Sequence, residues 1–255
     1  MKEKIMLITG AGHGIGKGVA ERAAAAGWTV LVTDQSLASA HEVANALVSL
    51  GQRAEAYALD VTDAAAIERL MDNLHGRTVD VLINNAGLQY VARIEEFPQE
   101  IWDRLIRVML NGPCMLTRAV LEPMRQQGFG RIINIGSIHS LVASPYKSAY
   151  VAAKHGLLGF SKVIALETAG TDITINTICP SYVRTQLVEQ QIASQAKQHG
   201  LSEADVIDQI MLKPMPKRTF ISIEELYGII TFLISDAARN ITGQAIPVDG
   251  GWTIQ

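Results

Sequence analysis

The segment IMLITGAGHGIGKGVAERAAAAG, residues 5–27, decides the fold. Its first five residues are an apolar run typical of a buried strand, and the stretch after Gly16 has the composition of a helix ending at Gly27. The glycines of TGAGHGIG between them allow a tight turn that can approach a pyrophosphate closely. A merely tight turn would also use glycine, but the order strand, turn, helix favours a dinucleotide site, because the helix N-terminus presents unpaired N–H donors. The residues expected to form it are Gly10, Gly14, Ile15 and Gly16.

Short β-rich runs alternate with longer amphipathic stretches along the rest of the chain. The runs at 28–33, 53–59, 80–83, 131–135 and 173–178 are almost continuously apolar, as strands are when helices cover both faces of a parallel sheet. No linker, low-complexity tract or internal repeat interrupts this alternation. The sequence therefore predicts a single α/β domain over residues 1–255, with a doubly wound, Rossmann-type parallel sheet and ligands at the carboxyl ends of its strands.

The segment 186–218 departs from this rhythm. It is rich in Gln, Ala, Lys, Glu and Met, ends in KPMPKR and follows a predicted strand end. A long insertion above the carboxyl edge of such a sheet is typical of a helical lid over a substrate. An immobile pair of surface helices would have the same composition.

Composition and charge narrow the class of protein. The formal net charge is −3 and no basic stripe is present, which argues against nucleic-acid binding. Cys114 and Cys179 lie far apart without metal-ligand spacing, so we expect neither a metal site nor a disulfide. The apolar run near the N-terminus is shorter than a signal segment, and no run reaches the ~20 apolar residues of a membrane span. We therefore expect a soluble, cytoplasmic protein with no membrane partner.

Asp34 comes directly after the second predicted strand. An acid at this position can accept hydrogen bonds from the adenosine ribose hydroxyls, and its charge repels a 2′-phosphate, so it favours NAD over NADP. Between Gly18 and Asp34 the only basic residue is Arg22, within the predicted helix. Asp34 could also cap the helix that begins near Ser36, and the two roles are compatible.

A catalytic group is indicated in SIHSLVASPYKSAYVAAK, residues 137–154. Tyr150 and Lys154 are four residues apart in a helical stretch and so share one face. An ammonium beside a phenol stabilises the phenolate, and lowering a tyrosine pKa from ~10 towards 7 takes about 4 kcal/mol. Such a tyrosine is a general base for an alcohol and a general acid for a ketone. Ser137, just after a predicted strand, can hydrogen-bond the same substrate oxygen.

Several of these features resemble the short-chain dehydrogenase/reductase family in order and spacing, over essentially the whole chain. They are TGAGHGIG, Asn84-Asn85-Ala86-Gly87, Asn111, Ser137 and the Tyr150–Lys154 pair. The resemblance implies that Tyr150 is the acid/base, that Ser137 orients the substrate and that Lys154 holds the nicotinamide ribose. It also implies that Asn111 holds a water in the proton relay. The other cofactor contacts that it implies are Asp60, Val61, Asn85, Gly87, Pro180, Val183 and Thr185. The family usually has Pro-Gly where this chain has Pro180-Ser181, which would strain Ser181 if that position needs a positive φ.

Four further polar residues flank the predicted catalytic group: Gln89, His139, Lys147 and Gln191. A cation and neutral amides at such a site suit a small carboxylate, whereas a steroid or fatty acyl chain needs an apolar pocket. Each residue has a simpler explanation as a solvated loop residue or surface charge. However, a lysine at a helix start is unfavourable unless it serves an anion.

The same four residues are similar to those of family members that act on a short 3-hydroxy acid, and this resemblance implies that they bind its carboxylate. It places Tyr182, Gln186 and Trp252 where they would close the pocket. The expected function is NAD-dependent interconversion of (R)-3-hydroxybutyrate and acetoacetate by a homotetramer, the assembly that the resemblance implies.

Two alternatives stay open. One is a dehydrogenase of the same family for another hydroxy acid or an acyl thioester. The other is a catalytically silent NAD-binding regulator, against which the complete Ser137–Tyr150–Lys154 set argues.

Overall fold

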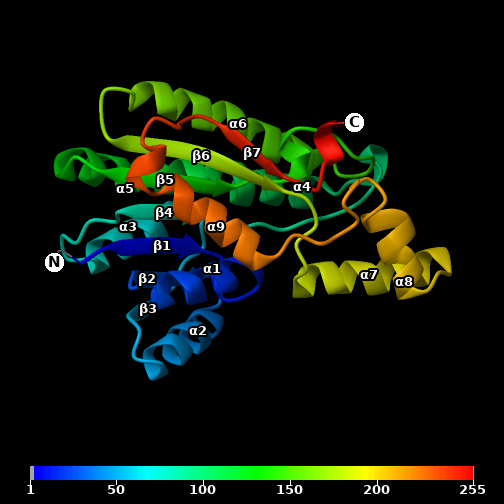
Figure 1. Ribbon diagram of the computed structural model, residues 1–255, viewed down its shortest axis with the longest axis horizontal. Helices are drawn as coiled ribbons and strands as arrows, with labels where there is room; N and C mark the ends of the chain where they lie inside the picture. Colours follow the sequence, from blue (N-terminus) through cyan, green and yellow to red (C-terminus); the bar gives the residue numbers. More distant parts are fainter. Residues whose placement is uncertain (1–2, 255) are drawn as a thin grey trace.

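The computed structural model describes residues 3–254, without the side chains of residues 186, 187, 194, 198 and 199. Seven parallel strands form one sheet in the order β3-β2-β1-β4-β5-β6-β7 (Figure 1). The strands are β1 Ile5–Thr9, β2 Thr29–Asp34, β3 Ala54–Ala58, β4 Val81–Asn84, β5 Gly130–Ile135, β6 Ile173–Pro180 and β7 Ala245–Val248. The predicted doubly wound α/β fold is confirmed, and β7 adds an edge strand to the six predicted ones.

Helices cover both faces of this sheet. The first face carries α1 Gly14–Ala25, α2 Leu37–Ser49 and α9 Ile223–Leu233, and the second carries α3 Ala64–Asn73, α5 Gly112–Gln127 and α6 Ser148–Glu167. Successive side chains of a strand point to opposite faces, so Met6 of β1 joins the first layer and Leu7 the second. The central strands β1 and β4 are buried on both faces and almost continuously apolar, whereas the edge strands β3 and β7 are only partly buried.

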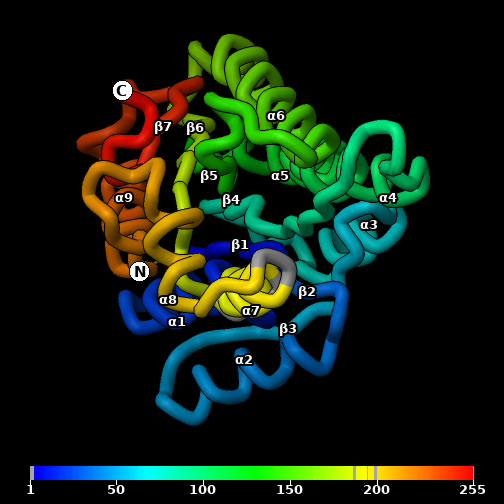
Figure 2. Tube along the Cα trace, turned by 90° about the vertical axis from the view of Figure 1, so that its right-hand side faces the viewer, coloured from blue at the N-terminus to red at the C-terminus, as the bar shows by residue number. Residues whose placement is uncertain are grey.

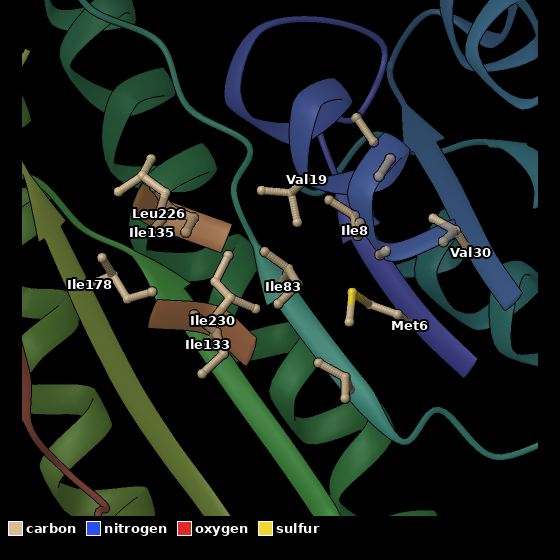
Figure 3. Packing of buried hydrophobic residues seen from close by; sticks show 14 of the residues in the cluster. Met6, Ile8, Val19, Val30, Ile83, Ile133, Ile135, Ile178, Leu226 and Ile230 are labelled. Carbon is tan, nitrogen blue, oxygen red and sulfur yellow. The ribbon is translucent and has the colours of Figure 1, made fainter. Parts of the chain in front are cut away.

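Figure 3 shows the first of these layers from close by. Leu226 and Ile230 of α9 lie beside Ile133 and Ile135 of β5, within one buried cluster. The N-terminus of α9 is held by a capping box in which Ser222 and Glu225 satisfy each other's backbone N–H groups. Among the described residues, no helix has the length and apolar character needed to cross a membrane.

All the strands end at one edge of the sheet. The strand order reverses between β1 and β4, which opens a crevice at their carboxyl ends. Beyond this edge stand α7 Gln186–His199 and α8 Glu203–Asp205, followed by a π-helix, Val206–Met211 (Figures 1 and 2). The predicted segment 186–218 is therefore helical and lies above the carboxyl edge.

Candidate active site

A cleft of about 960 Å³ follows the carboxyl edge. The sequence-predicted residues that line it are Gly10, Gly14, Ile15, Asp34, Asp60, Val61, Asn85, Gly87, Gln89, Ser137, His139, Lys147, Tyr150, Lys154, Pro180, Val183, Thr185 and Gln191. They come from segments that end or follow successive strands, and these segments meet because parallel strands share one carboxyl edge. Predicted cofactor, catalytic and substrate residues thus share one cleft.

The glycine-rich turn leaves room for a ligand above it. A Cβ at Gly16 would overlap the carbonyl oxygen of Gly10, so the turn is tightly closed there. A Cβ at Gly14 would instead stand in the cleft, no nearer than 3.9 Å to Thr185. Asn85 Nδ2 donates to the Gly10 carbonyl at 3.1 Å and ties the turn to the end of β4. An open cradle at the N-terminus of α1 fits the pyrophosphate of a dinucleotide.

Asp34 occupies the next part of the cleft. Its Oδ2 accepts the Gly12 N–H at 3.0 Å and its Oδ1 accepts the Ser36 N–H at 3.0 Å. Ser36 is itself the N-cap of α2, so Asp34 supports the cap and is not the cap. His13, which the sequence analysis did not single out, places Nδ1 3.7 Å from Asp34 Oδ2. The carboxylate therefore shapes the glycine turn and presents a negative charge where an adenosine ribose would lie.

Ser137, Tyr150 and Lys154 lie together in the middle of the cleft. Ser137 Oγ accepts the His139 N–H at 3.1 Å, which fixes the hydroxyl at the end of β5. Lys154 Nζ lies 5.8 Å from the centroid of the Tyr150 ring and donates to the Ile135 carbonyl at 2.7 Å. Burial lowers the pKa of Lys154 to about 8.

The protein surroundings shift the pKa of the Tyr150 phenol upward. Burial raises the pKa of Tyr150, and the nearby Ser137 hydroxyl opposes that shift without reversing it. The Lys154 ammonium is directed at a backbone carbonyl, and loss of hydration of the phenolate dominates the pKa of Tyr150. The predicted lowering of this pKa, which also relies on the positive nicotinamide ring of an oxidised cofactor, stays a prediction. Tyr150 is therefore a phenol in this structure, the form that can donate a proton.

Lys147 and His139 lie at one side of Tyr150. Lys147 is the N-cap residue of α6 and places Nζ 3.3 Å from His139 Nε2. The His139 ring is edge-on to both Tyr150 and Trp252, with centroids 6.1 and 5.9 Å away. Tyr182 stacks on Trp252 at 6.1 Å, so an aromatic wall encloses this end of the cleft. The Lys147 cation is thus held in an enclosed place, where burial lowers its pKa.

Gln89 and Gln191 meet across the cleft. Gln191 Nε2 of α7 donates to Gln89 Oε1, in the loop after β4, at 2.8 Å. The four predicted carboxylate-binding residues therefore form two bonded pairs in the cleft that holds Tyr150. Gln186 belongs to the first turn of α7, and its side chain lies outside the described part of the structure.

Asn111 does not line the cleft that holds Ser137, Tyr150 and Lys154. It ends a π-helix, Arg107–Asn111, between α4 Gln99–Ile106 and α5, and its side chain is exposed and absent from the cleft lining. Two residues along a helix point to nearly opposite sides, and it is Met109 that faces α6, packed with Ala149 and Ala153. The expected water-holding role of Asn111 is not tested by this placement and stays a prediction.

Two further features lie beside and beneath the site. Ser181 does not adopt a positive φ, so the expected strain is absent. Beneath the site, Asn84 Nδ2 donates to Asn134 Oδ1 at 2.8 Å, and Asn134 Nδ2 donates to Ser161 at 2.9 Å. This buried chain links β4, β5 and α6. Its signals in the sequence are Asn84 of the NNAG segment and the asparagine within the apolar run RIINI.

Known proteins share this sequence and fold. The pattern of the family described as short chain dehydrogenase matches residues 4–196. D-beta-hydroxybutyrate dehydrogenase from Rhizobium meliloti is 43% identical over 259 residues, covering 99% of each chain. The protein of the same name from Cupriavidus necator is 42% identical over 254 residues, covering 99% of this chain and 98% of its own. A crystal structure of a variant actinorhodin polyketide ketoreductase with NADPH has a TM-score of 0.92 at 31% identity, covering 98% of this chain and 97% of that one.

The family pattern spans most of the sheet, the glycine turn and the Tyr150–Lys154 helix. The relatives match over nearly the full length, and the solved structure shares the same fold. On these grounds, the chain belongs to the short chain dehydrogenase family of oxidoreductases.

Proposed function

We propose that this protein interconverts (R)-3-hydroxybutyrate and acetoacetate with NAD. The observation that carries the proposal is the position of the two bonded pairs, Lys147 with His139 and Gln89 with Gln191, in the cleft that holds Tyr150. A partly buried cation and amide donors near an acid/base suit a small carboxylate. The names of the two relatives from Rhizobium meliloti and Cupriavidus necator support the same substrate.

Tyr150 is the proposed acid/base. In the oxidative direction its phenolate takes the proton of the substrate hydroxyl, and in the reductive direction its phenol returns a proton to the developing alkoxide. Ser137 holds the substrate oxygen, and Lys154 would hold the nicotinamide ribose. A nicotinamide dinucleotide, when bound, supplies the hydride chemistry, with the glycine turn, Asp34 and the residues after β3, β4 and β6 holding it.

Lys147 is the proposed charge partner of the substrate carboxylate. His139 accepts a hydrogen bond from one N–H of the Lys147 ammonium. The other two N–H groups of the ammonium can then face the carboxylate of the substrate. Anchoring the carboxylate fixes which face of the reacting carbon meets the cofactor, and a misplacement of about 1 Å can cost 10²-fold in rate. The lid would exclude water and bring Gln191 to the acid.

NAD is the proposed cofactor because Asp34 presents a negative charge where NADP carries its 2′-phosphate. The related polyketide ketoreductase that was solved with NADPH defines the alternative. The alternative reaction, reduction of an acyl thioester with NADPH, would leave the Lys147 cation without an anion to bind, although it would keep its hydrogen bond to His139.

The decisive experiment is initial NADH formation at 340 nm with separate (R)- and (S)-3-hydroxybutyrate. NADP replaces NAD in one control, and acetoacetyl thioester with NADPH is the second. Saturable turnover with the (R) acid and NAD alone is the expected result. Turnover confined to the thioester, or none with either enantiomer, would contradict the proposed substrate and leave the family assignment standing.

A homotetramer in the cytoplasm is proposed as its state in the cell. Val163 and Leu166 on α6 and Phe232 on α9 are exposed apolar side chains that a partner subunit could cover. Cys114 and Cys179 are both free thiols. Light scattering after size-exclusion chromatography tests the assembly, and fractionation of the native cells tests the compartment.

A further inference from the structure

The outer part of the lid packs on itself: Val188 and Ile192 of α7 form a small core with Val206 and Met211. The end of the lid is anchored to the sheet, because Leu212 and Met215 belong to the first buried layer. The main packing partners of α7 are α8 and the π-helix that follows it. Figure 1 shows α7 and α8 beyond the strand ends, and Figure 2, seen from that side, shows them in front of the sheet. α7 is thus joined to the sheet mainly through the segment that follows it, so a direct contact across the cleft would help to hold α7 there.

That contact is the bond between Gln191 and Gln89. Gln191 Nε2 donates to Gln89 Oε1 at 2.8 Å between residues that are both partly buried. Among the described side chains of α7, it is the hydrogen bond that reaches the opposite wall of the cleft. The other polar pair near this helix, Arg184 with Glu189, stays on the lid side.

The opposite wall is itself held in place. Gln89 lies in the loop after β4, where the Ala92 N–H donates to the Tyr146 carbonyl at 3.0 Å. Tyr146 directly precedes Lys147, the N-cap of α6. The neighbouring Leu88 packs on the buried cluster around Met109. Gln89 is therefore attached to the helix that carries Lys147 and Tyr150, and the lid is aligned with the catalytic group through it.

The amide pair also keeps donors for a ligand. The bond uses the oxygen of Gln89 and one hydrogen of Gln191, so both Gln89 N–H groups and the second Gln191 N–H remain. A carboxylate could accept these hydrogens without breaking the bond between the amides. One neutral hydrogen bond favours the closed arrangement only about two- to tenfold, so the lid still opens often enough for a substrate to enter.

We propose that Gln89 is a positioning residue that, through Gln191, holds the lid over the cleft before any substrate binds. Only one part of this proposal rests on the proposed function: the same two amides would also bind the carboxylate of the substrate. The lid is then closed in the free protein, and the amide N–H groups that would bind the carboxylate are in position before the substrate arrives.

The test measures lid position in the full-length protein without substrate. One spin label is attached to the exposed native Cys114 on α5 and another to Lys197→Cys on the exposed surface of α7, with Cys179 buried and unlabelled. Dilution with unlabelled chain keeps the measured distances within one molecule. Pulsed electron–electron resonance then compares the parent with Gln89→Ala, Gln191→Ala and Gln89→Glu.

We expect one narrow distance distribution for the parent and a broader one for both alanine variants. Gln89→Glu should keep the narrow distribution, because a carboxylate accepts the Gln191 N–H at least as well as an amide does. Gln209→Ala is the matched control, since this lid glutamine bonds Asp205 within the lid. The rate of NADH dissociation should rise about two- to tenfold in both alanine variants, and no further in the double variant.

Unchanged distributions in Gln89→Ala and Gln191→Ala would overturn the proposal, as would broadening in Gln89→Glu. None of these measurements uses turnover. A protein inactive with 3-hydroxybutyrate that still shows the expected distances would reject the substrate and retain the lid contact.

Discussion

The ammonium nitrogen of Lys147 lies 3.3 Å from Nε2 of His139. An ammonium can only donate, so Nε2 is unprotonated and Nδ1 carries the hydrogen that faces the Val142 carbonyl at 3.4 Å. Burial, and then the charge of Lys147, lowers the pKa of His139 to about 4. A neutral His139 therefore orients Lys147 in the cleft and adds no second charge.

This neutrality predicts a loss of stability in weak acid. Between pH 6.5 and 4 the unfolded chain binds a proton at His139 and the folded chain does not, so the free energy of unfolding falls as the pH falls through that window. The effect of this one group approaches about 3 kcal/mol at the acid end. We expect urea unfolding of His139→Asn to show a correspondingly smaller decrease from pH 7 to pH 4.5 than the parent. Parallel decreases in the two proteins would contradict a buried neutral imidazole.

Replacing Lys147 should affect the acid and spare the cofactor. Lys147→Ala removes the proposed charge partner of the carboxylate, and a hydrogen bond to a charged group is worth about 1.5–3 kcal/mol. We expect the KM for the hydroxy acid to rise about 10- to 100-fold, with the dissociation constant for NADH unchanged. Lys162→Ala, on the same helix but outside the cleft lining, is the matched control. An equal loss of NADH binding would mean that Lys147 supports the fold of the cleft.

Replacing Tyr150 should abolish the proton transfer alone. Tyr150→Phe keeps the ring and removes the hydroxyl, so we expect kcat to fall about 10²- to 10⁴-fold with NADH binding retained. Since burial raises the pKa of Tyr150, oxidation by the parent, which needs the phenolate, should speed up as the pH rises above neutral. Reduction needs the phenol and should not gain in this way. Turnover in Tyr150→Phe close to that of the parent would exclude Tyr150 as the acid/base.

The sheet and the cofactor end of the cleft could be read from the sequence because they depend on local order. An apolar run, a glycine turn and a helix occur in that order at residues 5–27, and parallel topology then brings the strand ends to one edge. The prediction for Asp34 needed only its place at the end of the second strand. Predicting these features does not require the exact first and last residues of each strand and helix.

The rest depends on side-chain direction and depth, which spacing does not give. The π-helix before α5 turns Met109 toward α6 and leaves Asn111 exposed, although the two are only two residues apart. The pKa of Tyr150 follows from burial that only the packed structure defines. Gln89 and Gln191 are 102 residues apart in sequence, and their bond arises from the position of the lid.

Cofactor choice should depend on the charge of Asp34. Its carboxylate also accepts two backbone N–H groups, so Asp34→Asn, which keeps one oxygen acceptor, is a gentler change than alanine. A unit charge about 4 Å from another contributes about 1–4 kcal/mol between bulk water and a protein surface, so kcat/KM with NADP should rise about tenfold or more. The value with NAD should fall, because the ribose hydroxyls lose a charged acceptor. His13→Gln, which changes the neighbouring side chain 3.7 Å from Asp34, is the control and should leave the NAD preference in place. If Asp34→Asn leaves the ratio of the two cofactors unchanged, the carboxylate serves the glycine turn alone and the preference must be sought elsewhere in the cleft.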